Sequence, residues 1–175
     1  MKRPLICSAF FALTIPTLAH ADDGDPVPVK FRNGFSASLS EEFGRGFSGQ
    51  LYGVDWRIGA QINHQLGIYL DNHLSFGSVH PTGGVGGITG DYASAITAEY
   101  TFPAAFFVGG GLGYGVLNNP SGPLVLVRAG WYPFQLDANQ TERHLNLAFD
   151  ARFYFPGDPV GETTQLAISI GYDRF

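Results

Sequence analysis

An uninterrupted alternation of side chains over residues 52–63 restricts the folds open to this chain more than any other feature. The apolar face carries Tyr52, Val54, Trp56, Ile58, Ala60 and Ile62, and the opposite face carries Gly53, Asp55, Arg57, Gly59, Gln61 and Asn63. A period of two is that of a β-strand. These twelve residues exceed the roughly five or six of a strand in a soluble sheet. The length instead matches a strand that crosses a bilayer at a tilt.

The same alternation recurs along the chain, and turn residues separate the segments. Including the first, the alternating segments are 35–40, 51–63, 66–76, 92–102, 106–116, 125–132, 145–155 and 166–173. An even number of strands brings both ends of a barrel to the same side of the membrane. We therefore predict an all-β fold, a closed antiparallel eight-stranded transmembrane β-barrel. Outer loops are expected near residues 44–49, 79–90, 118–123 and 156–162, and the glycine-rich 79–90 is the longest.

Aromatic residues gather near the ends of the predicted strands. The inner ends carry Tyr100, Phe102, Phe106, Phe107, Trp131 and Phe134, and the outer ends carry Tyr52, Phe76, Tyr92, Phe153 and Phe155. Two aromatic girdles are typical of a barrel in a bilayer, because these rings favour the interfaces. Beyond residue 21 the chain has no apolar run of about 18 residues, so no transmembrane helix is predicted.

The first 21 residues predict a cleaved signal peptide. Lys2 and Arg3 precede an apolar stretch, residues 5–18, and Ala19-His20-Ala21 is a small-x-small cleavage site. Residues 22–30 form a Pro-rich flexible lead-in, and residues 31–175 form the transmembrane barrel domain. Cleavage changes the net charge from −5 to −7 and removes the only cysteine, Cys7. An acidic chain without basic runs is not expected to bind nucleic acid.

The chain ends in Phe175 on an alternating strand. Together with the signal peptide, the eight segments and the girdles, this end resembles the OmpA/OmpX and opacity-type small barrels of Gram-negative outer membranes. The resemblance implies an integral outer-membrane protein surrounded by lipid and lipopolysaccharide. It also implies that barrel-assembly machinery recognises the C-terminal strand, with Phe175 as the signal. The family usually places an aromatic residue two positions earlier, whereas here Asp173 occupies that position and the aromatic residue is Tyr172.

The ionisable residues of the predicted strands share the face opposite the apolar one. Inward-facing side chains are expected at Asp55, Asp71, Glu99, Asp150, Arg57, Arg128, Arg152 and His73. The interior of an eight-stranded barrel is just wide enough for side chains to fill it, and buried charges there must be paired. We therefore predict a lumenal network that closes the barrel and a structural or surface-interaction role. A narrow gated path for ions or small solutes through the same network is the alternative.

Other chemistry is weakly indicated. The glycines between Gly109 and Gly115 lack the following Lys-Ser or Lys-Thr and helix of a phosphate-binding loop. His73 and Ser75 resemble the start of the active-site motif of outer-membrane lipid A deacylases. That motif continues with Asn, whereas Phe76 follows here, and no acidic partner lies where the motif needs one. The histidines do not cluster at ligand spacing, so neither a metal nor another cofactor is predicted.

A soluble lipocalin-like barrel is a further alternative, with its apolar face turned inward around a ligand. Alternation alone does not distinguish the inside of a barrel from the outside. The girdles and the terminal Phe175 favour the membrane.

Overall fold

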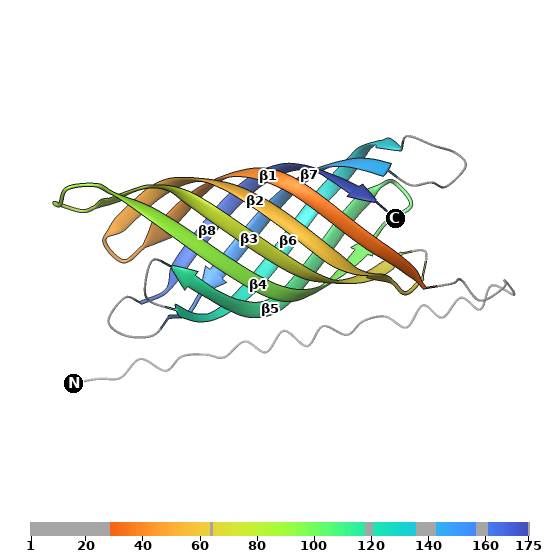
Figure 1. The fold of residues 1–175 in the computed structure, drawn as a ribbon, viewed down its shortest axis with the longest axis horizontal. Helices are drawn as coiled ribbons and strands as arrows, with labels where there is room; N and C mark the ends of the chain where they lie inside the picture. The colour runs from red at the N-terminus through yellow and green to blue at the C-terminus, as the bar shows by residue number, and fades with distance from the viewer. Residues whose placement is uncertain (1–28, 64, 118–120, 136–142, 157–160, 175) are drawn as a thin grey trace, which may run out of the picture.

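The computed structural model describes residues 29–63, 65–117, 121–135, 143–156 and 161–174. The predicted signal peptide and most of the lead-in, residues 22–28, lie outside these ranges, as does Phe175. The strands are β1 (Lys30–Gly44), β2 (Phe47–Gln61), β3 (Leu66–Pro81), β4 (Gly87–Thr101), β5 (Phe106–Leu117), β6 (Ser121–Gln135), β7 (Arg143–Tyr154) and β8 (Thr163–Arg174). Each pairs antiparallel with the next, and β8 pairs with β1 to close the barrel (Figure 1). The predicted fold class is confirmed.

The apolar face of each strand points outward. On β2, Tyr52 and Ile58 are 60 % and 47 % exposed, whereas Asp55 and Arg57 are 5 % and 4 % exposed. The same division holds on the other strands, where residues such as Ile96, Leu112 and Ile168 are exposed. An apolar exterior of this extent suits lipid and would be unfavourable in water. It contradicts the lipocalin-like alternative, which needs the apolar face inside. No described residue belongs to a helix long and apolar enough to cross a membrane.

The β1–β2 and β3–β4 turns are shorter than the sequence predicts. β1 and β2 are joined by only Arg45 and Gly46, and Gly46 has a φ of +82°, which favours glycine. The expected loop 79–90 is wrong, because β3 continues to Pro81 and β4 begins at Gly87, leaving residues 82–86 as the turn. This hairpin projects farthest from the barrel in Figure 1. Strands that pair beyond the bilayer do not need an apolar face. The ends of β3 and β4 therefore show no apolar alternation in the sequence from which they could be predicted.

At the inner end some aromatic side chains face outward and others turn into the barrel. Phe106 and Trp131 stack on neighbouring strands with ring centroids 6.0 Å apart. Phe107 does not belong to the girdle as predicted, since its side chain is only 1 % exposed and packs against Tyr132 inside the barrel. Two consecutive residues of a strand point to opposite faces, so Phe106 and Phe107 cannot both face lipid.

Candidate functional site: the polar interior

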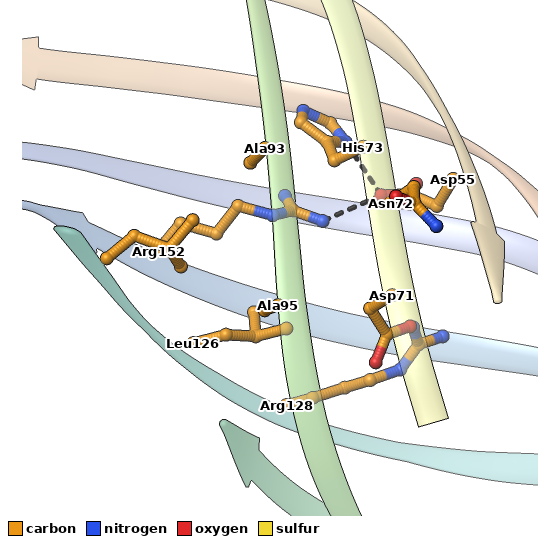
Figure 2. Close-up of a pocket in the computed structure, with 10 residues that line it drawn as sticks. Asp55, Asp71, Asn72, His73, Ala93, Ala95, Leu126, Arg128 and Arg152 are labelled. Carbon is orange, nitrogen blue, oxygen red and sulfur yellow. Dashed lines mark hydrogen bonds and ion pairs between the residues drawn. The ribbon is translucent and has the colours of Figure 1, made fainter. Parts of the chain in front are cut away.

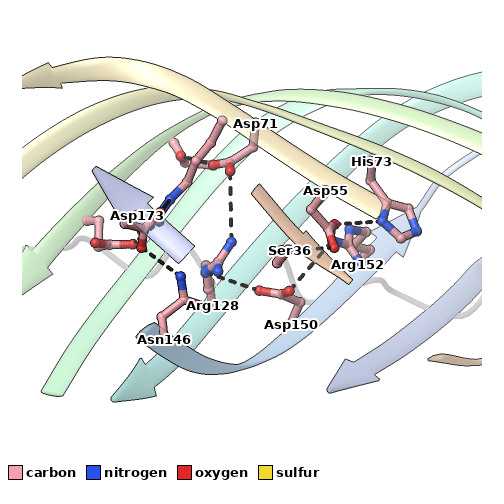
Figure 3. Close-up of polar contacts among 12 residues, drawn as sticks. Ser36, Asp55, Asp71, His73, Arg128, Asn146, Asp150, Arg152 and Asp173 are labelled. Carbon is pink, nitrogen blue, oxygen red and sulfur yellow. Dashed lines mark hydrogen bonds and ion pairs between the residues drawn. The ribbon is translucent and has the colours of Figure 1, made fainter. Parts of the chain in front are cut away.

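The polar interior is the candidate site, because it gathers the ionisable side chains of most strands. The eight residues predicted from sequence are each at most 9 % exposed and are carried by β2, β3, β4, β6 and β7. Figure 3 shows most of them converging on one column of contacts along the barrel. Arg57, Arg128 and Arg152 each lie within 4.0 Å of at least one carboxylate.

Arg57 is the centre of the inner part of this column. Its guanidinium donates to Glu99 at 2.6 Å, to the Asp173 Oδ1 at 2.8 Å and to the Tyr132 hydroxyl at 3.0 Å. A further bond joins Arg57 to Asp173 Oδ2. The guanidinium also lies over the Tyr69 ring, 4.8 Å from its centroid. Planar, multi-donor arginine is suited to holding two carboxylates at once. This single side chain therefore ties β2 to β4, β6 and β8.

Asp173 is a member of this network that the sequence analysis missed. Its side chain is 2 % exposed, and besides Arg57 it accepts a hydrogen bond from Asn146 at 2.7 Å. β8 keeps a continuous register with β1 and β7 as far as Arg174, so Tyr172 faces outward and Asp173 inward. The departure from the family pattern is thus a lumenal carboxylate. One sequence feature could have identified it: Asp173 lies on the strand face opposite the apolar residues of segment 166–172.

Arg128 and Arg152 organise the remainder of the column. Arg128 lies 3.9 Å from Asp71 and 3.5 Å from Asp150. Arg152 lies 2.7 Å from Asp55, which the His73 Nδ1 also approaches at 2.7 Å (Figure 2). Asp55 on β2 therefore holds together β3 and β7. Opposite charges alternate along the column, which is how buried ions offset the cost of leaving water.

A small cavity lies beside Arg128 and Arg152. It is about 10 Å³ and is lined by side chains that include Asp55, His73, Arg128 and Arg152. Within the described part of the chain, the His73 Nε2 has no hydrogen-bond partner. A space of about this size holds roughly one water molecule.

The inward neighbours of two glycines on β5 differ from those of Gly34 on β1. An added Cβ at Gly111 or Gly115 would meet the side chains of Thr97 and Tyr154, respectively. At Gly34, in contrast, it would overlap Asp173 Oδ1 and lie 3.1 Å from Arg57 Nε. Gly34 is the register partner of both residues, on β1 between β2 and β8. Because glycine has no side chain, Arg57 and Asp173 have the space to contact each other across β1.

Replacing Gly34 with alanine should destabilise the barrel by about 1–3 kcal/mol, the usual cost of overpacking a filled interior. The new methyl group would displace the Asp173 carboxylate from Arg57. Equilibrium denaturant unfolding in lipid vesicles measures the change. Gly90→Ala is the matched control, because the nearest atom to its added Cβ is 3.6 Å away. Equal stability of the two variants would contradict the assigned role of Gly34.

The two residues of the deacylase-like motif lie inside the barrel. Ser75 is fully buried and accepts a hydrogen bond from Gln165 at 3.3 Å, while His73 is held by Asp55. Neither side chain reaches the lipid-facing surface. Across the described residues, no group of three or more His, Cys, Asp or Glu side chains is arranged to hold a metal ion.

Solved structures of other proteins have a similar fold. Neisserial surface protein A superposes with a TM-score of 0.66 at 13 % identity, covering 85 % of this chain and 99 % of that one. Ail of Yersinia pestis, in complex with the heparin analogue sucrose octasulfate, gives a TM-score of 0.55 at 12 % identity, covering 82 % and 97 %. No family model matches the sequence, and no curated protein does. The apolar exterior, the polar interior and this likeness together show an integral outer-membrane β-barrel with the fold of the small OmpA/OmpX-type proteins.

Proposed function

We propose that this protein is a structural or surface-interaction component of the outer membrane whose lumen is closed by its own charged side chains. The contacts that cross the lumen carry this proposal. Arg57 on β2 reaches β6 and β8, Arg152 on β7 reaches Asp55 on β2, and Gln165 on β8 reaches Ser75 on β3. These strands are not neighbours in the sheet. Their side chains therefore meet in the middle of the barrel and occupy the space that a solute would need.

The partners that this role requires are those of the exterior. Lipid and lipopolysaccharide would cover the apolar outer face, and barrel-assembly machinery would engage the C-terminal strand with its terminal Phe175. The role needs no cofactor and no nucleic acid. In the outer hairpins, Val85 and Ile88 are 95 % and 88 % exposed near the β3–β4 turn. Apolar side chains displayed in this way support a surface contact more than a solute pathway.

Planar-bilayer recording of the refolded protein tests the closed lumen. We expect no large, stable conductance, because open aqueous channels belong to barrels of about sixteen strands or more. A purified porin recorded under the same conditions is the positive control. Steady large conductance from the wild type would contradict the proposal.

A narrow cation path is the second candidate, and the charge balance of the interior favours it. The buried side chains of the described strands include four arginines against seven carboxylates. If such a path exists, Arg128→Ala should raise a small conductance, because the weakly held Arg128 separates Asp71 from Asp150. The reversal potential in a salt gradient would then indicate selectivity for cations. Unchanged conductance in this variant supports the closed barrel.

A further inference from the structure

Two polar side chains on neighbouring strands interrupt the lipid-facing wall. The outward positions of β3 run Leu70, Asn72 and Leu74, and the register partner of Asn72 on β4 is Ser94. Ser94 also takes an outward position, two residues from the exposed Ile96. Polar side chains that face hydrocarbon are unfavourable unless they have a partner, and they commonly mark functional sites.

Asn72 is recessed in this wall and is overlain by aromatic rings. It is only 7 % exposed, whereas Leu70 and Leu74 on either side of it are 47 % and 44 % exposed. The Tyr92 hydroxyl donates to Asn72 Oδ1 at 3.0 Å. The Tyr92 ring in turn lies 6.3 Å, centroid to centroid, from the ring of Trp56, the register partner of Asn72 on β2. One distance, one ring contact and two register pairs therefore bring these side chains to a common point.

The hydrogen-bonding groups left over at this point include two donors. Within the described residues, the amide nitrogen of Asn72 has no hydrogen-bond partner, and neither does the Ser94 hydroxyl. Hydrocarbon offers no water to take the place of a partner, so an unpaired amide there is costly. The group that would satisfy both donors is an oxygen acceptor that reaches the wall from the lipid side.

The depth of the pair in the wall indicates which lipid supplies that acceptor. On β4 the predicted outer girdle is at Tyr92 and the inner girdle at Tyr100, and Ser94 is the first outward position inside Tyr92. The pair therefore faces acyl chains of the outer leaflet, just below the interface that girdle rings favour. In an outer membrane that leaflet consists of lipopolysaccharide, whose acyl chains carry carbonyl and hydroxyl oxygens several carbons below the sugars. Phospholipid carbonyls lie at the interface itself.

We propose that Asn72 and Ser94 bind an acyl-chain oxygen of one lipopolysaccharide molecule, with Tyr92 and Trp56 packing against the chain that carries it. A narrow, flexible acyl chain fits a recessed amide, whereas the convex wall of a second barrel would meet the exposed leucines and rings first. The site rests on the proposed lipopolysaccharide surroundings of the protein. It lies on the outside of the barrel, so it does not depend on whether the lumen conducts.

Tryptophan fluorescence observes the site directly, because the chain has two tryptophans and Trp131 stacks on Phe106 at the inner end. Hexa-acylated lipid A is titrated into refolded Trp131→Phe protein in zwitterionic detergent micelles, and the emission of Trp56 should change and saturate. Native mass spectrometry of the same sample should retain one lipid A per chain. Phosphatidylglycerol, an anionic phospholipid, should bind about tenfold less tightly, roughly the worth of one hydrogen bond.

Two variants remove the donors, and two others make the same replacements elsewhere on the outer face. Asn72→Leu and Ser94→Ala should each weaken lipid A binding about three- to tenfold, the effect of losing one hydrogen bond. Asn33→Leu, at the inner end of β1, and Ser78→Ala, near the outer end of β3, are the matched controls, since both side chains are exposed. Both controls should bind lipid A like the wild type.

Stability in phospholipid vesicles without lipid A separates a binding role of Asn72 from a structural one. Asn72→Leu should be at least as stable there as the wild type, because it removes an unpaired amide from the lipid face. If the bond from Tyr92 were the whole purpose of Asn72, this variant would be less stable. Heat-modifiable mobility on a gel verifies that each variant is folded.

Four results would overturn the proposal. They are no saturable binding of lipid A by the wild type, equal retention of phosphatidylglycerol, an equal loss of binding in Asn33→Leu, and lower stability of Asn72→Leu in phospholipid. A dimer that forms without lipid A and is lost in Asn72→Leu would also overturn it, and would assign the site to a second copy of the chain. None of these results alters the conductance expected of the closed lumen.

Discussion

Replacing Arg57 with alanine is expected to lower the free energy of unfolding by about 3–5 kcal/mol, the cost of removing one partner from a buried ion pair. Glu99 and Asp173, which are 2 % exposed, would lose the cation that both contact. The Tyr132 hydroxyl would also lose a donor. Each group would remain in an interior from which water is largely excluded, so the loss exceeds that of the bonds alone. Urea unfolding in lipid vesicles, followed by tryptophan fluorescence, measures the change.

Two further variants separate this cost from a general effect of losing an arginine. Arg45→Ala removes an exposed guanidinium at the β1–β2 turn and should change stability by less than about 0.5 kcal/mol. Adding Glu99→Gln and Asp173→Asn to Arg57→Ala should recover part of the loss, because both unpaired charges disappear. A loss below about 1 kcal/mol for Arg57→Ala would mean that the pair behaves as a solvated surface salt bridge. The closed-lumen proposal would then lose its main support.

Placing an arginine at Ile96 is expected to destabilise the barrel by about 2–4 kcal/mol, the cost of a charge facing lipid near the bilayer midplane. Ile96 is 67 % exposed on the outward face of β4, and its register partners Leu70 and Leu112 are also exposed and apolar. No carboxylate is carried by these three positions to pair with the new charge. The measurement is the same vesicle unfolding experiment.

Ile88→Arg is the matched control because it makes the same replacement on the same face of the same strand. Ile88 is 88 % exposed, next to the β3–β4 turn and beyond Tyr92 of the outer girdle. There an arginine should cost only about 0–1 kcal/mol. Equal costs at the two positions would contradict the assignment of the outer face to lipid, whereas a cost confined to Ile96 places the bilayer along β4.

The fold follows from the sequence because alternation, length and turn residues agree with one another. The segment 52–63 predicts both the direction of Arg57 and the exposure of Ile58, and the structure has both. The ends of the long strands were less predictable. Outside the bilayer neither face of a strand needs to be apolar, so the pairing of Val79 with Gly87 leaves no mark in the pattern.

The lack of alternation at the strand ends also explains why two lumenal residues were not predicted from the sequence. Glu42 lies two residues beyond the predicted segment 35–40, and Asp91 lies immediately before 92–102, so neither was assigned to a predicted strand. Their strands in fact continue past them. The partners of each arginine were also beyond prediction. Arg57 bonds across β1 to Asp173 because of Gly34, and a contact between side chains two strands apart depends on stagger and local space, not on alternation.

The position of Asp173 on the strand that closes the barrel has a consequence for biogenesis. The ribosome makes Arg57 well before Asp173, and the two meet only when β8 pairs with β1. A truncated or incompletely inserted chain would present Arg57 without one of its two carboxylates. The charge balance of the interior is therefore completed in the same step that joins the two edges of the sheet. A periplasmic protease that attacks unfinished barrels would meet a looser molecule until that step, and a markedly more resistant one after it.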